Sequence, residues 1–273
     1  LVYGLAQSGT LNLDLGVQGL NGAFGGTGAD TLNAGSVVGA LLNGGDGNDT
    51  LTGATGDDWL SGGLGSDVLN GGAGDDTLLI DAADLQSNIN GGDGFDIAVV
   101  TGTAGVTLDL FHTKFEAAIG GDGNDWFNTT GTGRTVLAGQ GGDDVLKSGA
   151  GHDVLQGGTG NDILYGGLGT DTAVYTGNQA DYEFVANANG SVTVRDINVS
   201  NGDDGSDTLY GIQTIRFADG DISLSPTNTG KGEFRVNTTT VRDQFYPSVA
   251  SLADGGYVVT WMDDTATATD ANI

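Results

Sequence analysis

The chain has 273 residues, of which 52 are Gly, 36 are acidic and only 8 are Lys or Arg, so its formal net charge is −28. Such an acidic chain does not bind nucleic acid through phosphate contacts, and an anionic membrane surface repels it. Cys is absent, which excludes disulfides and thiolate metal ligands. No apolar run is long enough for a transmembrane segment, and abundant Gly argues against a helical bundle.

The first residues do not look like a natural start. Residues 1–7 lack an initiator Met and the basic and apolar regions of a signal peptide. We therefore expect the chain to be a fragment of a larger protein.

A nine-residue repeat dominates the sequence. Residues 44–79 read GGDGNDTLT, GATGDDWLS, GGLGSDVLN and GGAGDDTLL, with Asp at the sixth position and Leu at the eighth. A second block covers 139–174, and single repeats occur at 25–33, 91–99 and 120–128. The Gly-rich first six residues predict a turn. The last three predict a short strand whose middle side chain points inward.

Two repeats make one coil of a flattened solenoid, so residues 18 apart are expected to stack at about 4.8 Å. Asp49 then lies next to Asp67, and Asp58 next to Asp76. Carboxylates this close repel each other unless a cation lies between them. Together with the turn carbonyls they form an oxygen-only donor set, which favours calcium over magnesium.

These repeats resemble the RTX (repeats-in-toxin) nonapeptide GGxGxDxUx, a calcium-binding β-helix signature. The resemblance covers residues 24–33, 44–79, 91–99, 120–128 and 139–174. It implies an all-β fold, a right-handed parallel β-roll (β-solenoid), with calcium between turns one coil apart. In that family the lower turn supplies the carbonyls of its second and fourth positions and its Asp. The upper turn supplies the carbonyls of its first and third positions and its Asp.

Carried over to this chain, the resemblance implies about six calcium ions. Four ligand sets have the 18-residue spacing: Gly45, Gly47 and Asp49 with Gly62, Leu64 and Asp67; Ala54, Gly56 and Asp58 with Gly71, Ala73 and Asp76; Gln140, Gly142 and Asp144 with Gly157, Thr159 and Asp162; and Gly149, Gly151 and Asp153 with Gly166, Leu168 and Asp171. Two sets are spaced by 19: Gly26, Gly28 and Asp30 with Gly44, Asp46 and Asp49; and Gly121, Gly123 and Asp125 with Gly139, Gly141 and Asp144. Asp96 is a further candidate ligand. Ala54, Gln140 and Ser148 stand where the pattern has Gly, at a cost in backbone freedom.

The chain also repeats at an offset of 95, which places Asp14 on Asp109 and Asp49 on Asp144. We infer a duplication that divides one long solenoid into roll unit 1 (1–102) and roll unit 2 (103–175). The segments around Asp14 and Asp109 alternate like strands, and we expect these two Asp to be solvated. The Asp-free half-turns 34–43 and 129–138 carry one extra residue, for which we expect a bulge.

After residue 174 the period ends. Alternating residues predict strands at 182–185, 191–195 and 208–217, and we expect a β-rich cap over 176–226. The stretch 205–224 resembles the segment that follows RTX blocks in bacterial exoproteins. A linker is expected at 226–230, followed by the start of a separate β-module (230–273), similar to one found in large bacterial surface and secreted proteins.

No catalytic constellation is visible, since both HExxH and GxSxG are absent, so we do not expect these residues to form an enzyme. The predicted function is an extracellular calcium-binding segment that folds on calcium binding. Six ions would reduce the formal net charge from −28 to −16. The resemblance implies export by type I secretion machinery and a secreted or cell-surface location.

Three roles of the parent protein remain open. One is a structural or adhesive surface protein, such as an adhesin or S-layer-like array, in contact with the cell surface or with its own copies. The second is a type I-secreted exoenzyme for which the solenoid is the export and folding domain. The third is a pore-forming toxin. The duplication and the additional module favour the first.

Overall fold

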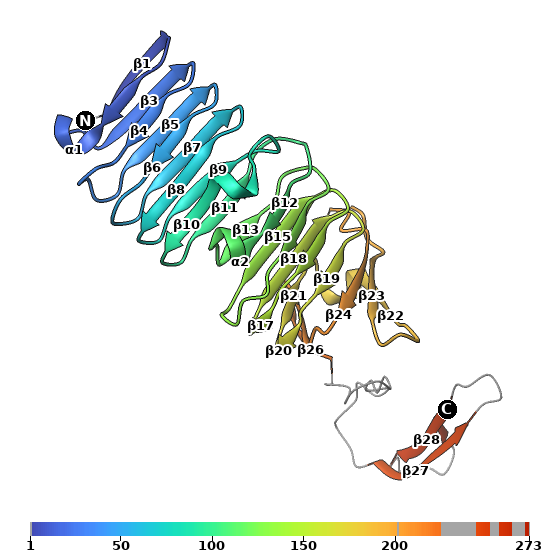
Figure 1. The fold of residues 1–273 in the computed structure, drawn as a ribbon. Helices are drawn as coiled ribbons and strands as arrows, with labels where there is room; N and C mark the ends of the chain where they lie inside the picture. The colour runs from blue at the N-terminus through green and yellow to red at the C-terminus, as the bar shows by residue number, and fades with distance from the viewer. Residues whose placement is uncertain (1, 201, 225–243, 252–256, 264–270, 273) are drawn as a thin grey trace. The chain divides into compact units, whose positions relative to one another are not determined.

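The structure is a computed structural model that describes residues 2–200, 202–224, 244–251, 257–263 and 271–272. Contacts divide the chain into two parts, residues 1–232 and 233–273, and each is considered by itself. The first part is a parallel β-solenoid (Figure 1), so the predicted all-β roll is confirmed.

One face of the solenoid is a continuous sheet, and the opposite face is divided into two sheets. The continuous sheet has 12 strands, in the order β1 (Val2–Ser8), β3 (Gly22–Thr27), β5 (Leu41–Asp46), β7 (Trp59–Leu64), β9 (Thr77–Ile80), β11 (Ile97–Val100), β13 (Ala117–Ile119), β15 (Val136–Gly141), β18 (Val154–Thr159), β21 (Thr172–Val174), β25 (Thr214–Phe217) and β26 (Gly220–Ser223). The first opposite sheet has β2 (Asn12–Asp14), β4 (Thr31–Asn33), β6 (Thr50–Thr52), β8 (Val68–Ala73) and β10 (Ile89–Asp93). The second has β12 (Thr107–Asp109), β14 (Trp126–Asn128), β16 (Val145–Lys147), β19 (Ile163–Tyr165), β24 (Ser206–Tyr210), β23 (Val192–Asp196) and β22 (Tyr182–Ala186). A small pair is formed by β17 (Ala150–Gly151) and β20 (Leu168–Gly169).

The register of the strands matches the predicted coil length. Leu41 pairs with Trp59, and Val136 pairs with Val154, both 18 residues on. Where the spacing is 19, as for β4 with β6, the pairing is equally regular. The extra residue therefore lies in the connecting loops 34–40 and 129–135, and the bulge expected in these half-turns is not formed within a strand.

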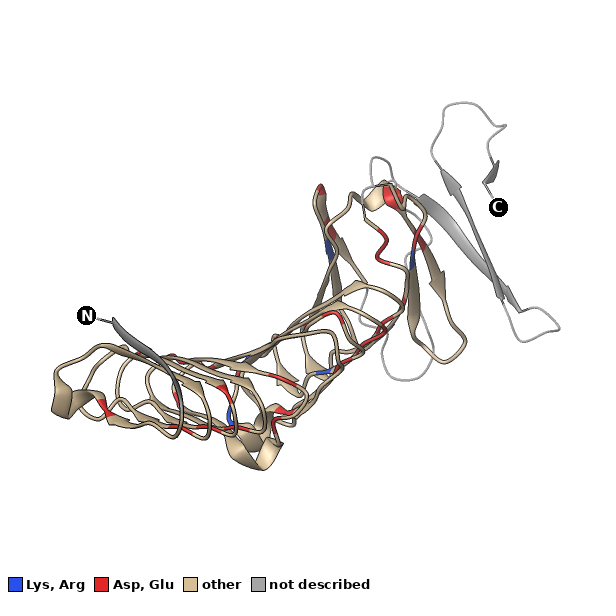
Figure 2. Ribbon diagram, turned by 90° about the horizontal axis from the view of Figure 1, so that it is seen from above, with Lys and Arg blue, Asp and Glu red and all other residues tan. Residues whose placement is uncertain are grey.

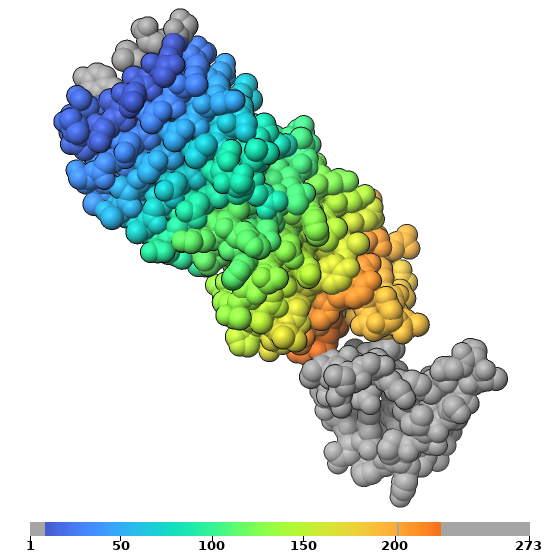
Figure 3. Space-filling model, in the orientation of Figure 1, coloured from blue at the N-terminus to red at the C-terminus, as the bar shows by residue number. Residues whose placement is uncertain are grey.

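The core is a narrow line of side chains between the two faces. Eighth-position residues point inward from every coil and stack on their counterparts, as Leu42, Leu60 and Leu78 do in successive strands of the continuous sheet. These three are fully buried. Figure 3 shows successive coils packed directly against one another. Parallel pairing thus converts a single repeated Leu into a continuous core.

The duplication is visible in two one-turn helices. Helix α1 (Leu15–Gln18) is capped by Asp14, and α2 (Leu110–Thr113) is capped by Asp109, each through a side-chain oxygen that accepts a backbone N–H. The expectation that these Asp are merely solvated is therefore wrong, because each satisfies a free N–H at a helix start. Two short 3₁₀ helices, η1 (Gln86–Asn88) and η2 (Gln179–Asp181), complete the elements of this part.

The repeat period ends before the solenoid does. Strands β24 and β25 pair in parallel with β19 and β21, so residues 206–217 add a further coil. The single strand predicted at 208–217 is wrong, because Gly211 turns the chain with φ 63° between the two strands. Strands β22, β23 and β26 then pair antiparallel at the sheet ends, which closes the last coil.

The second part contains an antiparallel sheet of β27 (Gln244–Ser251), β28 (Tyr257–Asp263) and β29 (Ala271–Asn272). The linker predicted at 226–230 lies outside the described residues.

Candidate metal centres

The sixth-position Asp residues lie inside the turns, although Asp is normally a surface residue. All are at most 3% exposed: Asp30, Asp49, Asp58, Asp67, Asp76, Asp96, Asp125, Asp144, Asp153, Asp162 and Asp171. Figure 2 shows the acidic residues spread along the coils, with few Lys or Arg among them. Buried charge of one sign needs a partner, so the contacts of these carboxylates decide what the turns can hold.

One oxygen of each carboxylate is bonded to the neighbouring coil. Asp49 N donates to Asp67 Oδ1 at 2.7 Å, and Asp144 N donates to Asp162 Oδ1 at 2.7 Å. The same bond joins the two Asp of every predicted ligand set, including both sets spaced by 19, at 2.7–3.0 Å. It also joins Asp76 to Asp96. The structure therefore brings together the turns of all six predicted sets, in lines of carboxylates that we call the Asp ladders.

The other oxygen has no partner in nine cases. It is inaccessible and unbonded in Asp30, Asp49, Asp67, Asp76, Asp96, Asp144, Asp153, Asp162 and Asp171. In Asp58 and Asp125 the second oxygen instead accepts from Ala54 N at 2.9 Å and from Gly121 N at 3.0 Å. A buried, unsatisfied carboxylate oxygen is strongly unfavourable. Nine of them, repeated with the coil period, indicate positions for a cation.

Several of the unpartnered oxygens lie close to a carbonyl oxygen of the next coil. Asp49 Oδ2 and the Gly62 carbonyl oxygen both lie within 2.6 Å of the position that a Cβ on Gly44 would occupy. No donor hydrogen lies between these two acceptors, and Gly62 is one of the predicted ligands. The first-position Gly is therefore required for space, and the convergent oxygens fit a hard cation such as calcium.

Burial dominates the electrostatics of these sites. It raises the pKa of Asp76, Asp96 and Asp162 from the ordinary value of 3.8 to about 6, and that of Asp144 to about 7. Neighbouring carboxylates raise these pKa values further, whereas the hydrogen bond from the previous coil lowers them. The ionised ladder thus lacks compensating positive charge, which a divalent ion between carboxylates would supply.

The departures from the repeat pattern have visible effects. Gln140 adopts φ 77°, in the region that is unfavourable for a residue with a side chain, whereas Ala54 and Ser148 do not have a positive φ, so the expected cost in backbone freedom is seen only at Gln140. The Ser148 hydroxyl donates to the Gly166 carbonyl oxygen at 2.6 Å. Ser148 therefore contacts one carbonyl of the fourth predicted set, a contact that the sequence did not suggest.

Four ladder ends were missed by the sequence analysis. Asp84, Glu116, Asp207 and Gln213 accept the N–H of the last repeat Asp, namely Asp67, Asp96, Asp162 and Asp171 respectively. Their spacings from these Asp are 17, 20, 45 and 42 residues, so none has the coil spacing of 18 or 19, and only Asp207 stands at a multiple of nine. One signal existed: residues 202–210, GDDGSDTLY, retain Gly, Gly, Asp and Leu at positions one, four, six and eight.

Within the described residues, no three His, Cys, Asp or Glu side chains converge as a metal-binding group. At each candidate site the carboxylates come in pairs, so backbone carbonyls must complete the coordination. None of the helices that the structure describes is both long and apolar enough to cross a membrane.

Comparison with protein families agrees with this geometry. The family model of the RTX calcium-binding nonapeptide repeat matches in 4 copies, over residues 23–36, 43–78 and 138–173. No curated protein matches the chain. Proteins with this repeat are typically secreted, and its β-roll is a structural fold that is not itself catalytic. The matched segments of this chain are thus RTX calcium-binding nonapeptide repeats, and they lie within the coils of the β-solenoid.

Proposed function

We propose that the solenoid is an extracellular segment that folds when calcium occupies about six sites between its turns. The observation that carries this proposal is the set of nine buried carboxylate oxygens without a partner. The residues that would hold calcium are the six ligand sets given above, with the Asp carboxylates as the charged donors. Asp96, bonded to Asp76 N, would extend one ladder beyond the family-model match.

The physical basis is mutual repulsion in the calcium-free chain. With 36 acids against 8 basic residues and one thin line of core side chains, the fold is poorly stabilised without bound cations. The binding free energy of calcium then becomes folding free energy. Bound calcium would also place positive charge next to each buried carboxylate pair.

We further propose that this coupling serves export. An unfolded chain would leave a calcium-poor cytosol through type I secretion machinery and fold outside, where calcium is abundant. In the parent protein we favour a structural or adhesive role at the cell surface. The 95-residue duplication supports it, because a longer solenoid adds length rather than chemistry. For the chain we propose roll units at 1–102 and 103–175, a cap at 176–226 and a further module at 230–273.

A calcium titration followed by far-UV circular dichroism tests the proposal, with magnesium as the control ion. We expect a cooperative gain of β signal with calcium at micromolar to millimolar concentration and little change with magnesium. A chain fully structured in excess chelator, with no response to calcium, would contradict the proposal.

A matched pair of variants locates the effect. Asp76→Asn removes a charge from a buried ladder position, whereas Asp75→Asn removes the same charge one residue away, at an exposed position. Asp75 Oδ1 accepts Phe95 N, and Asn keeps that acceptor. We expect Asp76→Asn to raise the calcium midpoint at least about tenfold, while Asp75→Asn stays within about twofold.

A further inference from the structure

Two Asp ladders end on the same three-residue arrangement, although the segments lie far apart in the sequence. Residues 114–116 follow Asp96 in one ladder, and residues 211–213 follow Asp171 in the other. We call each segment a closure, because its last side chain accepts the N–H of the final repeat Asp. Each segment begins with a left-handed residue, Lys114 at φ 55° and Gly211 at φ 63°. The middle residue of each is buried in the core.

The hydrogen bonds of the two closures match. Glu116 N and Ala117 N both donate to the Asp96 carbonyl at 3.1 Å, and Asp96 N donates to Glu116 Oε2 at 2.8 Å. In the second closure, Gln213 N and Thr214 N donate to the Asp171 carbonyl, and Asp171 N donates to Gln213 Oε1 at 2.6 Å. The closures differ chemically at the side chain that accepts, which is a carboxylate in one and an amide in the other.

The first closure gathers oxygens around a buried carboxylate. Asp96 is fully buried, and its Oδ2 has no hydrogen-bond partner. Asp96 Oδ2 and the Lys114 carbonyl oxygen both lie within 2.7 Å of the position that a Cβ on Gly91 would occupy. Glu116 brings a second carboxylate to the same turn through its bond to Asp96 N.

We propose that Asp96, Glu116 and the Lys114 carbonyl form a calcium site whose upper half comes from outside the nonapeptide repeats. The site extends the proposed function and rests on it, but it lies beyond all three segments that the family model matches. Its affinity depends on Glu116, because two carboxylates balance a divalent ion better than one where the protein supplies few other charges. The matching closure at Gln213 offers one carboxylate and binds calcium more weakly.

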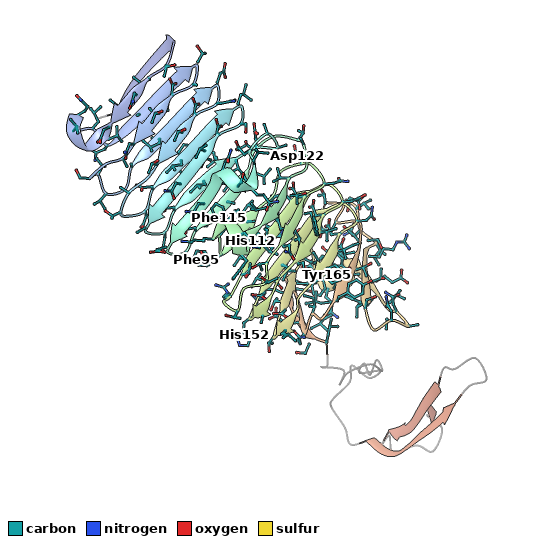
Figure 4. The ribbon with its side chains drawn as sticks, viewed as in Figure 1. Phe95, His112, Phe115, Asp122, His152 and Tyr165 are labelled. Carbon is teal, nitrogen blue, oxygen red and sulfur yellow. The ribbon has the colours of Figure 1, made fainter. Side chains whose placement is uncertain are left out.

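The position of this site gives it a specific role. The opposite face of the solenoid changes sheet between β10 and β12, so only the continuous sheet passes through the junction of the two roll units. Helix α2 packs against β10 there, and Figure 4 labels Phe95, His112 and Phe115 in this region. A calcium ion bound by Asp96 and Glu116 would join the last turn of the first roll unit to the segment that follows helix α2 in the second.

The test counts calcium ions on the 273-residue chain by native mass spectrometry and measures affinity by titration with calcium alone. Glu116→Gln should leave the circular dichroism at saturating calcium unchanged, since Gln213 already fills the equivalent place with an amide. We expect Glu116→Gln to lose one bound ion, or to bind it at least about tenfold more weakly. The reverse variant, Gln213→Glu, should strengthen binding of one ion.

The controls separate this site from the repeats. Asp76→Asn tests the repeat ladder and should change calcium binding whether or not the junction site exists. If Glu116→Gln binds as many ions as the parent chain with the same affinities while Asp76→Asn does not, the junction site is disproved and the proposed function stands. If no variant changes calcium binding, both fail.

Discussion

At the scale of single residues, the first-position Gly of each repeat is decisive, because it leaves room for oxygens. A Cβ on Gly44 would overlap Asp49 Oδ2 and the Gly62 carbonyl oxygen. Ser148 shows what a side chain does at such a position, since its hydroxyl bonds the carbonyl that it crowds. An Ala at the first position would place a Cβ in the same space but has no hydroxyl that could donate a hydrogen bond to the carbonyl.

Gly44→Ala is therefore expected to destabilise the calcium-saturated fold by about 2 kcal/mol, within the range for overpacking, and to raise the calcium midpoint. Gly133→Ala is the control, because its Cβ would meet nothing within 4 Å and its φ lies outside the left-handed region. That variant should stay within about 0.5 kcal/mol of the parent. Thermal unfolding in saturating calcium measures both, and equal effects would contradict a role of space at Gly44.

At the scale of elements, the sequence predicted the strands and ladder pairs that follow the period of nine. It could not predict which residues complete the last coil, because a segment without the repeat interrupts the chain before them. Asp207 and Gln213 reach the ladder after the excursion 175–205, so their partners are fixed by tertiary pairing rather than by the coil spacing of 18 or 19. A further feature was hidden at the fifth position, which the pattern leaves free: Asp57 Oδ1 accepts Asp75 N at 2.9 Å. The acceptor in each bond of this kind is an Asn or an Asp, such as Asn48 or Asp143, whereas repeats with another residue at the fifth position have no such acceptor.

The last coil differs from the others in how its carboxylate is satisfied. Asp207 Oδ2 accepts the Tyr175 hydroxyl at 2.8 Å, and burial raises the pKa of Asp207 to about 8. Tyr175→Phe removes this bond and leaves the carboxylate oxygen buried without a donor, a loss of about 1–3 kcal/mol. We expect a lower melting temperature and faster amide hydrogen exchange across β24 and β25.

Tyr210→Phe is the matched control, because the Tyr210 ring stacks on Tyr165 at 4.7 Å and its hydroxyl has only a 3.4 Å contact with Asn189 Nδ2. Phe retains the stacking, so this variant should be nearly neutral. If both variants behave alike, the Tyr175 hydroxyl does not secure the cap.

At the scale of the whole molecule, the buried acids make stability depend on protons as well as on calcium. Burial raises the pKa of Asp76, Asp96 and Asp162 to about 6, of Asp144 to about 7 and of Asp207 to about 8. An acid whose folded pKa exceeds its unfolded value binds its proton more tightly in the fold. Its contribution to stability is therefore complete below the unfolded value of 3.8 and is lost as pH rises through 6 to 8.

The calcium requirement of the fold should therefore grow with pH. In excess chelator, we expect more β signal at pH 5 than at pH 8, because protons neutralise the ladders that calcium would otherwise neutralise. In saturating calcium the signal should be similar at both pH values, so the difference made by calcium is small at pH 5 and large at pH 8. Circular dichroism at the two pH values, with and without calcium, measures this. A calcium-free chain that gains structure as pH rises would show that the buried carboxylates are not what opposes folding.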